Sequence, residues 1–80
     1  MKTPEALETA IKAAMSDTEP RSAAEIANAP DVRREALELD PGHDAFSTAG
    51  RHLGELHKRS EVRFDRESQG WLLGSDGITA

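Results

Sequence analysis

The chain of 80 residues contains no cysteine and no tyrosine. Without thiols, neither a disulfide framework nor a thiolate metal site can form. No apolar run is long enough to cross a bilayer, and the first residues lead directly into an amphipathic pattern rather than an apolar signal segment. We therefore expect a soluble, cytoplasmic protein that does not enter a membrane.

Large apolar side chains are scarce as well. Two phenylalanines and one tryptophan are the whole aromatic content, and alanine supplies much of the 36% of residues that are hydrophobic. A chain this short forms one domain with a small core, whose net stability we expect to be about 3–5 kcal/mol. Because the patterned region ends at residue 73, we predict one domain over 1–73 and a flexible C-terminal tail over 74–80.

Positive charge is in deficit, since the formal net charge is −5. The formal charge is −2 over residues 1–20, −3 over 21–44, +2 over 45–66 and −2 over 67–80. One net-positive segment in an acidic chain can direct one face of the protein toward phosphate. A two-unit excess in a short window is also an ordinary fluctuation, so composition alone favours neither a nucleic-acid partner nor a protein partner.

Three helices are predicted in the first half of the chain. A capping threonine followed by proline predicts a helix over 4–16, with apolar residues along one stripe. A capping box that starts at Ser22 begins a second helix, which ends near Asn28. A third helix begins at Pro30 and stops at the helix-breaking sequence 40–42.

The second half changes from helical to strand periodicity. Over about 45–59, apolar residues recur at intervals of 3, 4 and 3 and so share one helix face; they are Phe46, Ala49, Leu53 and Leu56. From residue 62, apolar and polar residues alternate on both sides of a loop that ends in glycine, which predicts a hairpin over 61–73. Four apolar hairpin residues are expected in the core, namely Val62, Phe64, Trp71 and Leu73.

A helix with a polar outer face that runs directly into a hairpin resembles the recognition helix and wing of a winged helix-turn-helix domain. The phrase Ser-Thr-Ala-Gly-Arg-His-Leu-Gly-Glu-Leu-His-Lys-Arg-Ser-Glu-Val over 47–62 is similar to the recognition helix of ArsR-like and MarR-like repressors. There, a Ser/Thr-rich start precedes a basic residue, two leucines and a basic end. The resemblance covers about 4–73 and implies an α+β fold with three core helices, a short connector helix and a C-terminal hairpin. It also implies a short strand at Arg21 that pairs with the hairpin.

One feature departs from the compact repressors. Ala27 and Ser47 are twenty positions apart, with a predicted extra helix between them. A long connector at this place resembles the HARE-HTH group and the RNA polymerase delta subunit, whose hairpins also close with an aromatic residue followed by leucine. That branch includes domains that act through protein contacts, and fold analogy does not decide between the two functions.

The resemblance implies a small transcriptional regulator, prokaryotic or viral, that binds double-stranded DNA and would be nucleoid-associated. Helix 45–59 would enter the major groove and wing 61–73 would lie on the backbone. The expected base-facing residues are Ser47, Thr48, Arg51 and His52. The expected phosphate contacts are Lys58, Arg59, Arg63 and Arg66, with Gln69 at the wing tip beside the minor groove.

Two alternatives stay open. The polar side of helix 45–59 is also what an ordinary solvated helix face looks like, and Glu55 weakens the case for phosphate. The chain is alternatively a protein-interaction module of a transcription or chromatin complex, or a small regulatory protein bound to a larger partner. Its contact surface would then be acidic and consist of Glu35, Glu38, Asp40 and Asp44. With either partner the protein could also form a homodimer, because one short helix offers few contacts and the core is small.

The sequence shows no motif for metal binding, catalysis or a glycine-rich phosphate loop. No pair among His43, His52 and His57 has the i, i+4 spacing of two metal ligands on one helix face. Ser47 and His52 lie about 140° apart around a helix axis, which is unsuitable for a catalytic pair. Gly50 and Gly54 lie inside a predicted helix and form no phosphate loop; they are expected to allow close approach of a neighbouring helix. We expect no metal, no cofactor and no enzymatic activity.

Overall fold

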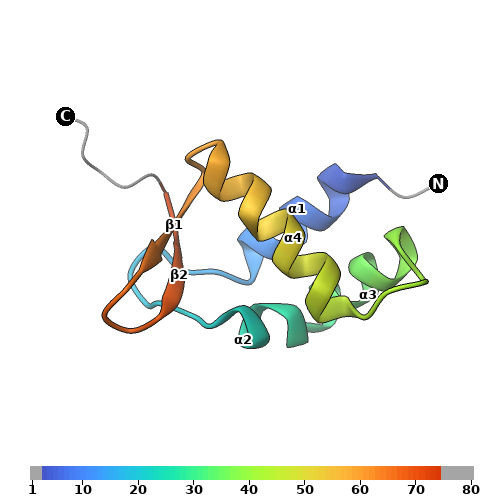
Figure 1. The fold of residues 1–80 in the computed structure, drawn as a ribbon, viewed down its shortest axis with the longest axis horizontal. Coiled ribbons are helices and arrows are strands. Elements are labelled where there is room, and N and C mark those ends of the chain that lie inside the picture. Colours follow the sequence, from blue (N-terminus) through green and yellow to red (C-terminus); the bar gives the residue numbers. More distant parts are fainter. Residues whose placement is uncertain (1–2, 75–80) are drawn as a thin grey trace.

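Four helices precede an antiparallel hairpin in the computed structural model, which describes residues 3–74 (Figure 1). The elements are α1 (Pro4–Ala13), α2 (Ala23–Asn28), α3 (Pro30–Leu39), α4 (Ala45–Lys58), β1 (Val62–Asp65) and β2 (Gly70–Leu73). The result is a small α+β fold, and its arrangement is compatible with a winged helix. Apart from Gly74, the predicted tail lies outside the described residues. No helix within 3–74 is long and apolar enough to span a membrane.

Local capping explains where the helices begin. The Thr3 side chain accepts a hydrogen bond from the Ala6 amide at 3.3 Å, and Asp44 accepts from the Ser47 amide at 2.7 Å. Ser22 and Glu25 form both hydrogen bonds of the capping box that begins α2. α1 ends three residues earlier than predicted, because the Ser16 hydroxyl accepts hydrogen bonds from two following amides and so starts a turn.

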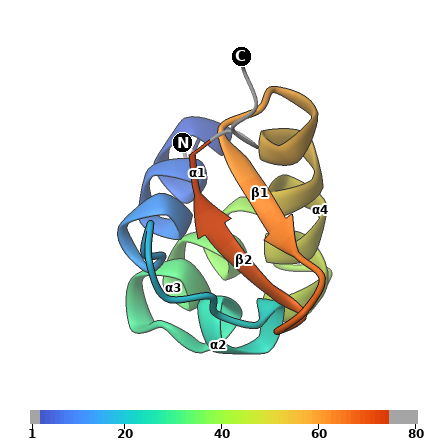
Figure 2. The ribbon, with the colours of Figure 1, turned by 90° about the vertical axis from the view of Figure 1, so that its left-hand side faces the viewer.

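The hairpin is tied to the rest of the chain through its second strand. β1 and β2 pair so that Val62 lies opposite Leu73 and Phe64 lies opposite Trp71. Arg21 forms the expected bridge, since its amide donates to the Trp71 carbonyl at 3.1 Å and its carbonyl accepts from the Trp71 amide at 2.7 Å. β1 is the strand that lies beside α4 (Figure 2).

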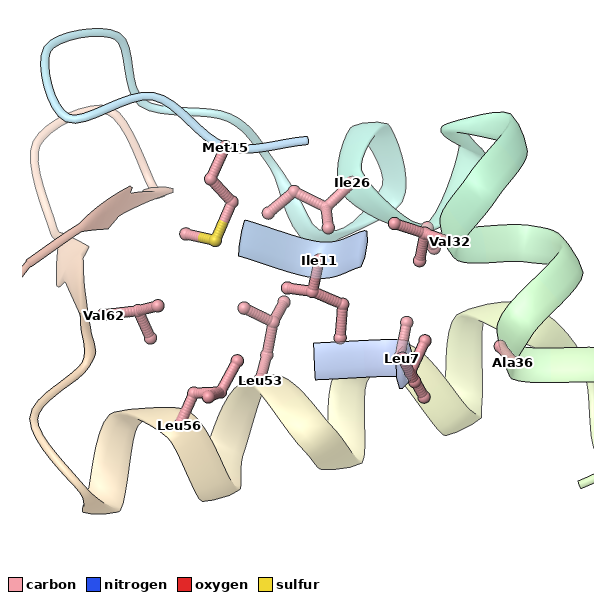
Figure 3. Close-up of a cluster of buried hydrophobic side chains, with 11 residues drawn as sticks. Leu7, Ile11, Met15, Ile26, Val32, Ala36, Leu53, Leu56 and Val62 are labelled. Atoms are coloured by element: carbon pink, nitrogen blue, oxygen red, sulfur yellow. The ribbon is translucent and has the colours of Figure 1, made fainter. Parts of the chain in front are cut away.

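The core lies between the helices and extends to the first hairpin residue (Figure 3). Its largest fully buried apolar side chains are Leu7, Ile11, Ile26, Val32, Leu53, Leu56 and Val62. Because α4 contacts α1, α2 and α3, its buried sector is broad and central to the fold. α4 therefore packs against three helices, with its remaining side toward solvent.

The prediction that Phe46 and Phe64 lie on buried faces is wrong. The exposed fraction is 53% for Phe46 and 40% for Phe64. Phe46 lies in the first turn of α4, at the edge of a buried sector that is centred on Ala49, Leu53 and Leu56. Phe64 is one pair nearer the hairpin tip than the buried Val62, and its ring meets that of Trp71 edge to face.

Candidate nucleic-acid interface

A sharp turn joins α4 to the hairpin and fixes their relative position. The Glu61 amide donates to the Leu56 carbonyl at 2.9 Å, and Ser60 has a φ of 61°. Since Arg59 and Ser60 also bond back to the last turn of the helix, β1 starts immediately beside the C-terminal end of α4 (Figure 1). The outer side of α4 and the hairpin thus form one candidate interface.

The structure separates the four predicted base-facing residues into two pairs. Ser47 and Arg51 lie on the exposed side of α4, and 58% of the Arg51 side chain is exposed. Thr48 has an exposed fraction of only 1%, and only 13% of the His52 side chain is exposed. Thr48 and His52 are therefore not available to read bases, and their prediction as base-facing residues is wrong.

Helix geometry explains this correction. Successive residues are about 100° apart, so Thr48 and His52 belong to the same stripe as the buried Leu56. The i, i+4, i+8 spacing of these three residues was a signal in the sequence. The polar side chains of Thr48 and His52 nevertheless predict exposed positions, and this is why the expectation fails. Within residues 3–74, the Thr48 hydroxyl and the His52 Nδ1 atom are buried and form no hydrogen bond, although Nδ1 lies 3.6 Å from Oε2 of Glu8.

Arg51 has an internal partner. Its Nη2 atom lies 3.3 Å from Oδ2 of Asp40, and the same oxygen lies 2.9 Å from Nδ1 of His43. The hydrogen bond with His43, helped by Arg51, lowers the pKa of the Asp40 carboxyl below its usual value. One acid from the loop after α3 thus neutralises the charge nearest the start of α4.

The predicted phosphate contacts at the end of α4 are also paired with acids. Arg59 donates to Oε1 of Glu8 at 2.6 Å and lies 3.3 Å from Oε2 of Glu61, and the bond with Glu8 raises the pKa of the guanidinium. Arg59 therefore attaches α4 to α1 instead of pointing freely to solvent. Lys58 lies 3.7 Å from Glu55 but keeps 77% of its side chain exposed.

The hairpin carries the cations that are least engaged. Within residues 3–74, neither Arg63 nor Arg66 forms an ion pair; Arg63 is half-buried and Arg66 is exposed. Gln69 is exposed at the tip with a φ of 56°. The carboxylate of Asp65 accepts hydrogen bonds from Ser68 and from the backbone within the same turn, so it shapes the tip.

Two glycines on the outer side of α4 have open space above their Cα atoms. A Cβ atom at Gly50 or at Gly54 would meet nothing within 4 Å, and so the predicted close contact with a neighbouring helix is wrong. Each glycine nevertheless costs the helix about 1 kcal/mol relative to alanine. Packing within the described part of the chain does not account for this cost.

Sequence reasoning also missed a group of rings at the junction of α4 and the hairpin. The ring centroids of Phe64 and Trp71 are 5.0 Å apart, and those of Trp71 and His57 are 5.5 Å apart. Both contacts are edge-to-face. Phe64 and Trp71 were expected as ordinary core residues, and the partial exposure of the pair is visible only in three dimensions.

Comparison with known proteins adds no further constraint. No family model matches the chain, and no curated protein or solved structure is significantly similar to it. The case for function therefore depends on the residues and geometry described above.

Proposed function

We propose that the protein is a small transcriptional regulator of the winged helix-turn-helix class that binds double-stranded DNA. The observation that carries the proposal is the interface itself: α4 exposes one side along its length, directly beside a hairpin whose two arginines make no ion pair within residues 3–74. The Arg21 bridge to β2 further supports a winged-helix topology.

The footprint is smaller than the sequence predicts. On α4, Ser47 and Arg51 would face the major groove, and Lys58 would contact phosphate. On the hairpin, Arg63 and Arg66 would hold the backbone, with Gln69 at the tip. Thr48, His52 and Arg59 are left out, because Thr48 is buried, His52 keeps only 13% of its side chain exposed and Arg59 is bound to α1.

The internal ion pairs reduce the affinity without preventing binding. Exposed ion pairs are worth only about 0–1 kcal/mol, so Arg51 can exchange Asp40 for a phosphate or a guanine edge at small cost. The three cations assigned to phosphate, Lys58, Arg63 and Arg66, would give a salt slope, log Kd against log salt, of about 2.7. We therefore expect weak to moderate affinity that falls steeply with salt.

The test is fluorescence anisotropy with a labelled duplex, started at about 50 mM salt, where electrostatic affinity is strong. Arg51→Ala should weaken binding to a selected site more than to random duplex, whereas Lys58→Ala should weaken both equally. Arg33→Ala is the matched control, because it removes the same charge from an exposed position on α3. Absence of binding by the unmodified protein at this salt would contradict the proposal.

A protein-interaction module is the second candidate function, and two observations favour it. The cations of α4 have acidic neighbours, and Phe46 exposes 53% of its surface at the start of the same helix. Exposed aromatic residues beside mixed charges are typical of protein interfaces. If the duplex titration shows no binding, this candidate takes the place of the first.

A further inference from the structure

Three rings form a row in the corner between the end of α4 and the hairpin. Phe64 comes from β1, Trp71 from β2 and His57 from the last turn of α4. The planes of Phe64 and Trp71 are inclined at 63°, and those of Trp71 and His57 at 83°. We call Phe64, Trp71 and His57 the aromatic row. It connects the two parts of the proposed interface.

The aromatic row is open to solvent on one side. Phe64 is 40% exposed, His57 is exposed and Trp71 is half-buried. The row continues the hairpin face whose next pair, Val62 and Leu73, packs against the core. In an edge-to-face contact each ring gives only an edge or one face to its neighbour, so Phe64 retains π surface that nothing in the described chain covers.

The surroundings of the row favour an anionic ligand. Arg66 follows Phe64 by two positions at the start of the turn, and Lys58 is next to His57 with most of its side chain exposed. The nearest acid in sequence, Asp65, already accepts hydrogen bonds from Ser68 and from the Glu67 amide. An apolar segment of a protein partner could pack on the Phe64 ring, but it would form no favourable contact with the charge of Arg66.

We propose that the aromatic row stacks on an unpaired nucleobase while Arg66 and Lys58 hold the adjoining phosphates. Bases inside an intact duplex have both faces covered by their neighbours, so apart from its two terminal pairs only a base in a gap, a bulge or a single-stranded end offers a free face. The inference rests on the proposed function in taking DNA as the ligand. It adds that DNA with unpaired bases is preferred over fully paired DNA.

Trp71 provides the signal for the test, because it is the only tryptophan in the chain. Its fluorescence is followed while the protein is titrated with a paired duplex, with the same duplex carrying a short single-stranded gap, and with a single strand. The gapped DNA should bind more tightly than the paired duplex and should quench Trp71 more strongly.

Phe64→Leu removes the ring but keeps apolar bulk. It should weaken binding to gapped DNA about 5- to 150-fold, the range for loss of one stacked base, and leave the paired duplex unaffected. Leu37→Ala is the matched control, since Leu37 is 39% exposed on α3, and it should change neither affinity. If Phe64→Leu unfolds, Arg66→Gln takes its place and should weaken gapped DNA more than paired DNA.

The outcomes separate this inference from the proposed function. Equal affinity of the unmodified protein for gapped and paired DNA overturns the inference but leaves duplex binding intact. A folded Phe64→Leu variant that still prefers gapped DNA overturns it as well. Binding to gapped DNA alone supports the inference and refutes a duplex-binding regulator. Failure of every DNA to quench Trp71 overturns the inference alone, whereas absence of binding to every DNA by anisotropy overturns both proposals.

Discussion

Replacing Gly50 and Gly54 by alanine should stabilise the protein. Both lie inside α4, where glycine costs about 1 kcal/mol relative to alanine because it fixes more backbone entropy on folding. The added methyl group meets nothing within 4 Å at either position, so no steric cost opposes the gain. The double variant should therefore gain about 1.5–2 kcal/mol in free energy of unfolding.

This gain is large for so small a domain. Against an expected stability of about 3–5 kcal/mol, it would raise the melting temperature by roughly 6–16 °C. Urea unfolding followed by circular dichroism gives the free energy, and the m-value should not change because the same surface is exposed.

Gly70→Ala is the contrasting variant. A Cβ atom there would lie 2.7 Å from Cβ of Pro20 and 3.0 Å from the Arg21 amide nitrogen, so the strand bridge must shift and the protein should lose stability. A destabilised Gly54→Ala variant would refute this account of α4. If DNA approaches the helix backbone closely, the stabilised double variant should also bind duplex less tightly than the unmodified protein.

Two further predictions concern charge. Glu8→Gln should lower the free energy of unfolding, because Arg59 then loses the charged partner that it binds at 2.6 Å. An equal loss in Glu5→Gln, an exposed site in the same helix, would contradict this. The hydrogen bond from Lys12 lowers the pKa of Glu61 in the folded protein. A carboxyl whose pKa is lower in the folded than in the unfolded state stabilises the fold at pH values above its unfolded pKa, which is 4.5 for Glu61. Urea midpoints should therefore be constant near neutral pH and fall as pH drops below about 4.5, and Glu61→Gln should flatten that fall.

Short-range signals were sufficient to predict most of the elements. The capping box at Ser22, the proline that begins α3 and the breaker after Leu39 act through neighbouring residues, so the sequence alone locates the helix ends. The end of α1 was misplaced because an apolar stripe continues to Met15, whereas the Ser16 hydroxyl already draws the following amides into a turn.

The site was harder to predict, because it depends on contacts between distant parts of the chain. Glu8 and Arg59 are 51 positions apart, and no local pattern shows that one neutralises the other. The width of the buried sector on α4 depends on how three helices surround it. Thr48 and His52 were therefore expected outside, although they lie inside.

Three solvent-facing departures from local helix rules, at Phe46, Gly50 and Gly54, share one side of α4. Phe46, Gly50, Gly54 and His57 fall within about 80° around the axis of α4, and His57 contacts Trp71 of the hairpin. Each of the two glycines weakens the helix, and packing within residues 3–74 requires neither of them. Sequences depart from local consistency mainly where function requires it. This side of α4, with the adjoining hairpin, is therefore where a ligand should be sought, rather than the acidic residues around α3, which take part in ion pairs, caps and other internal contacts.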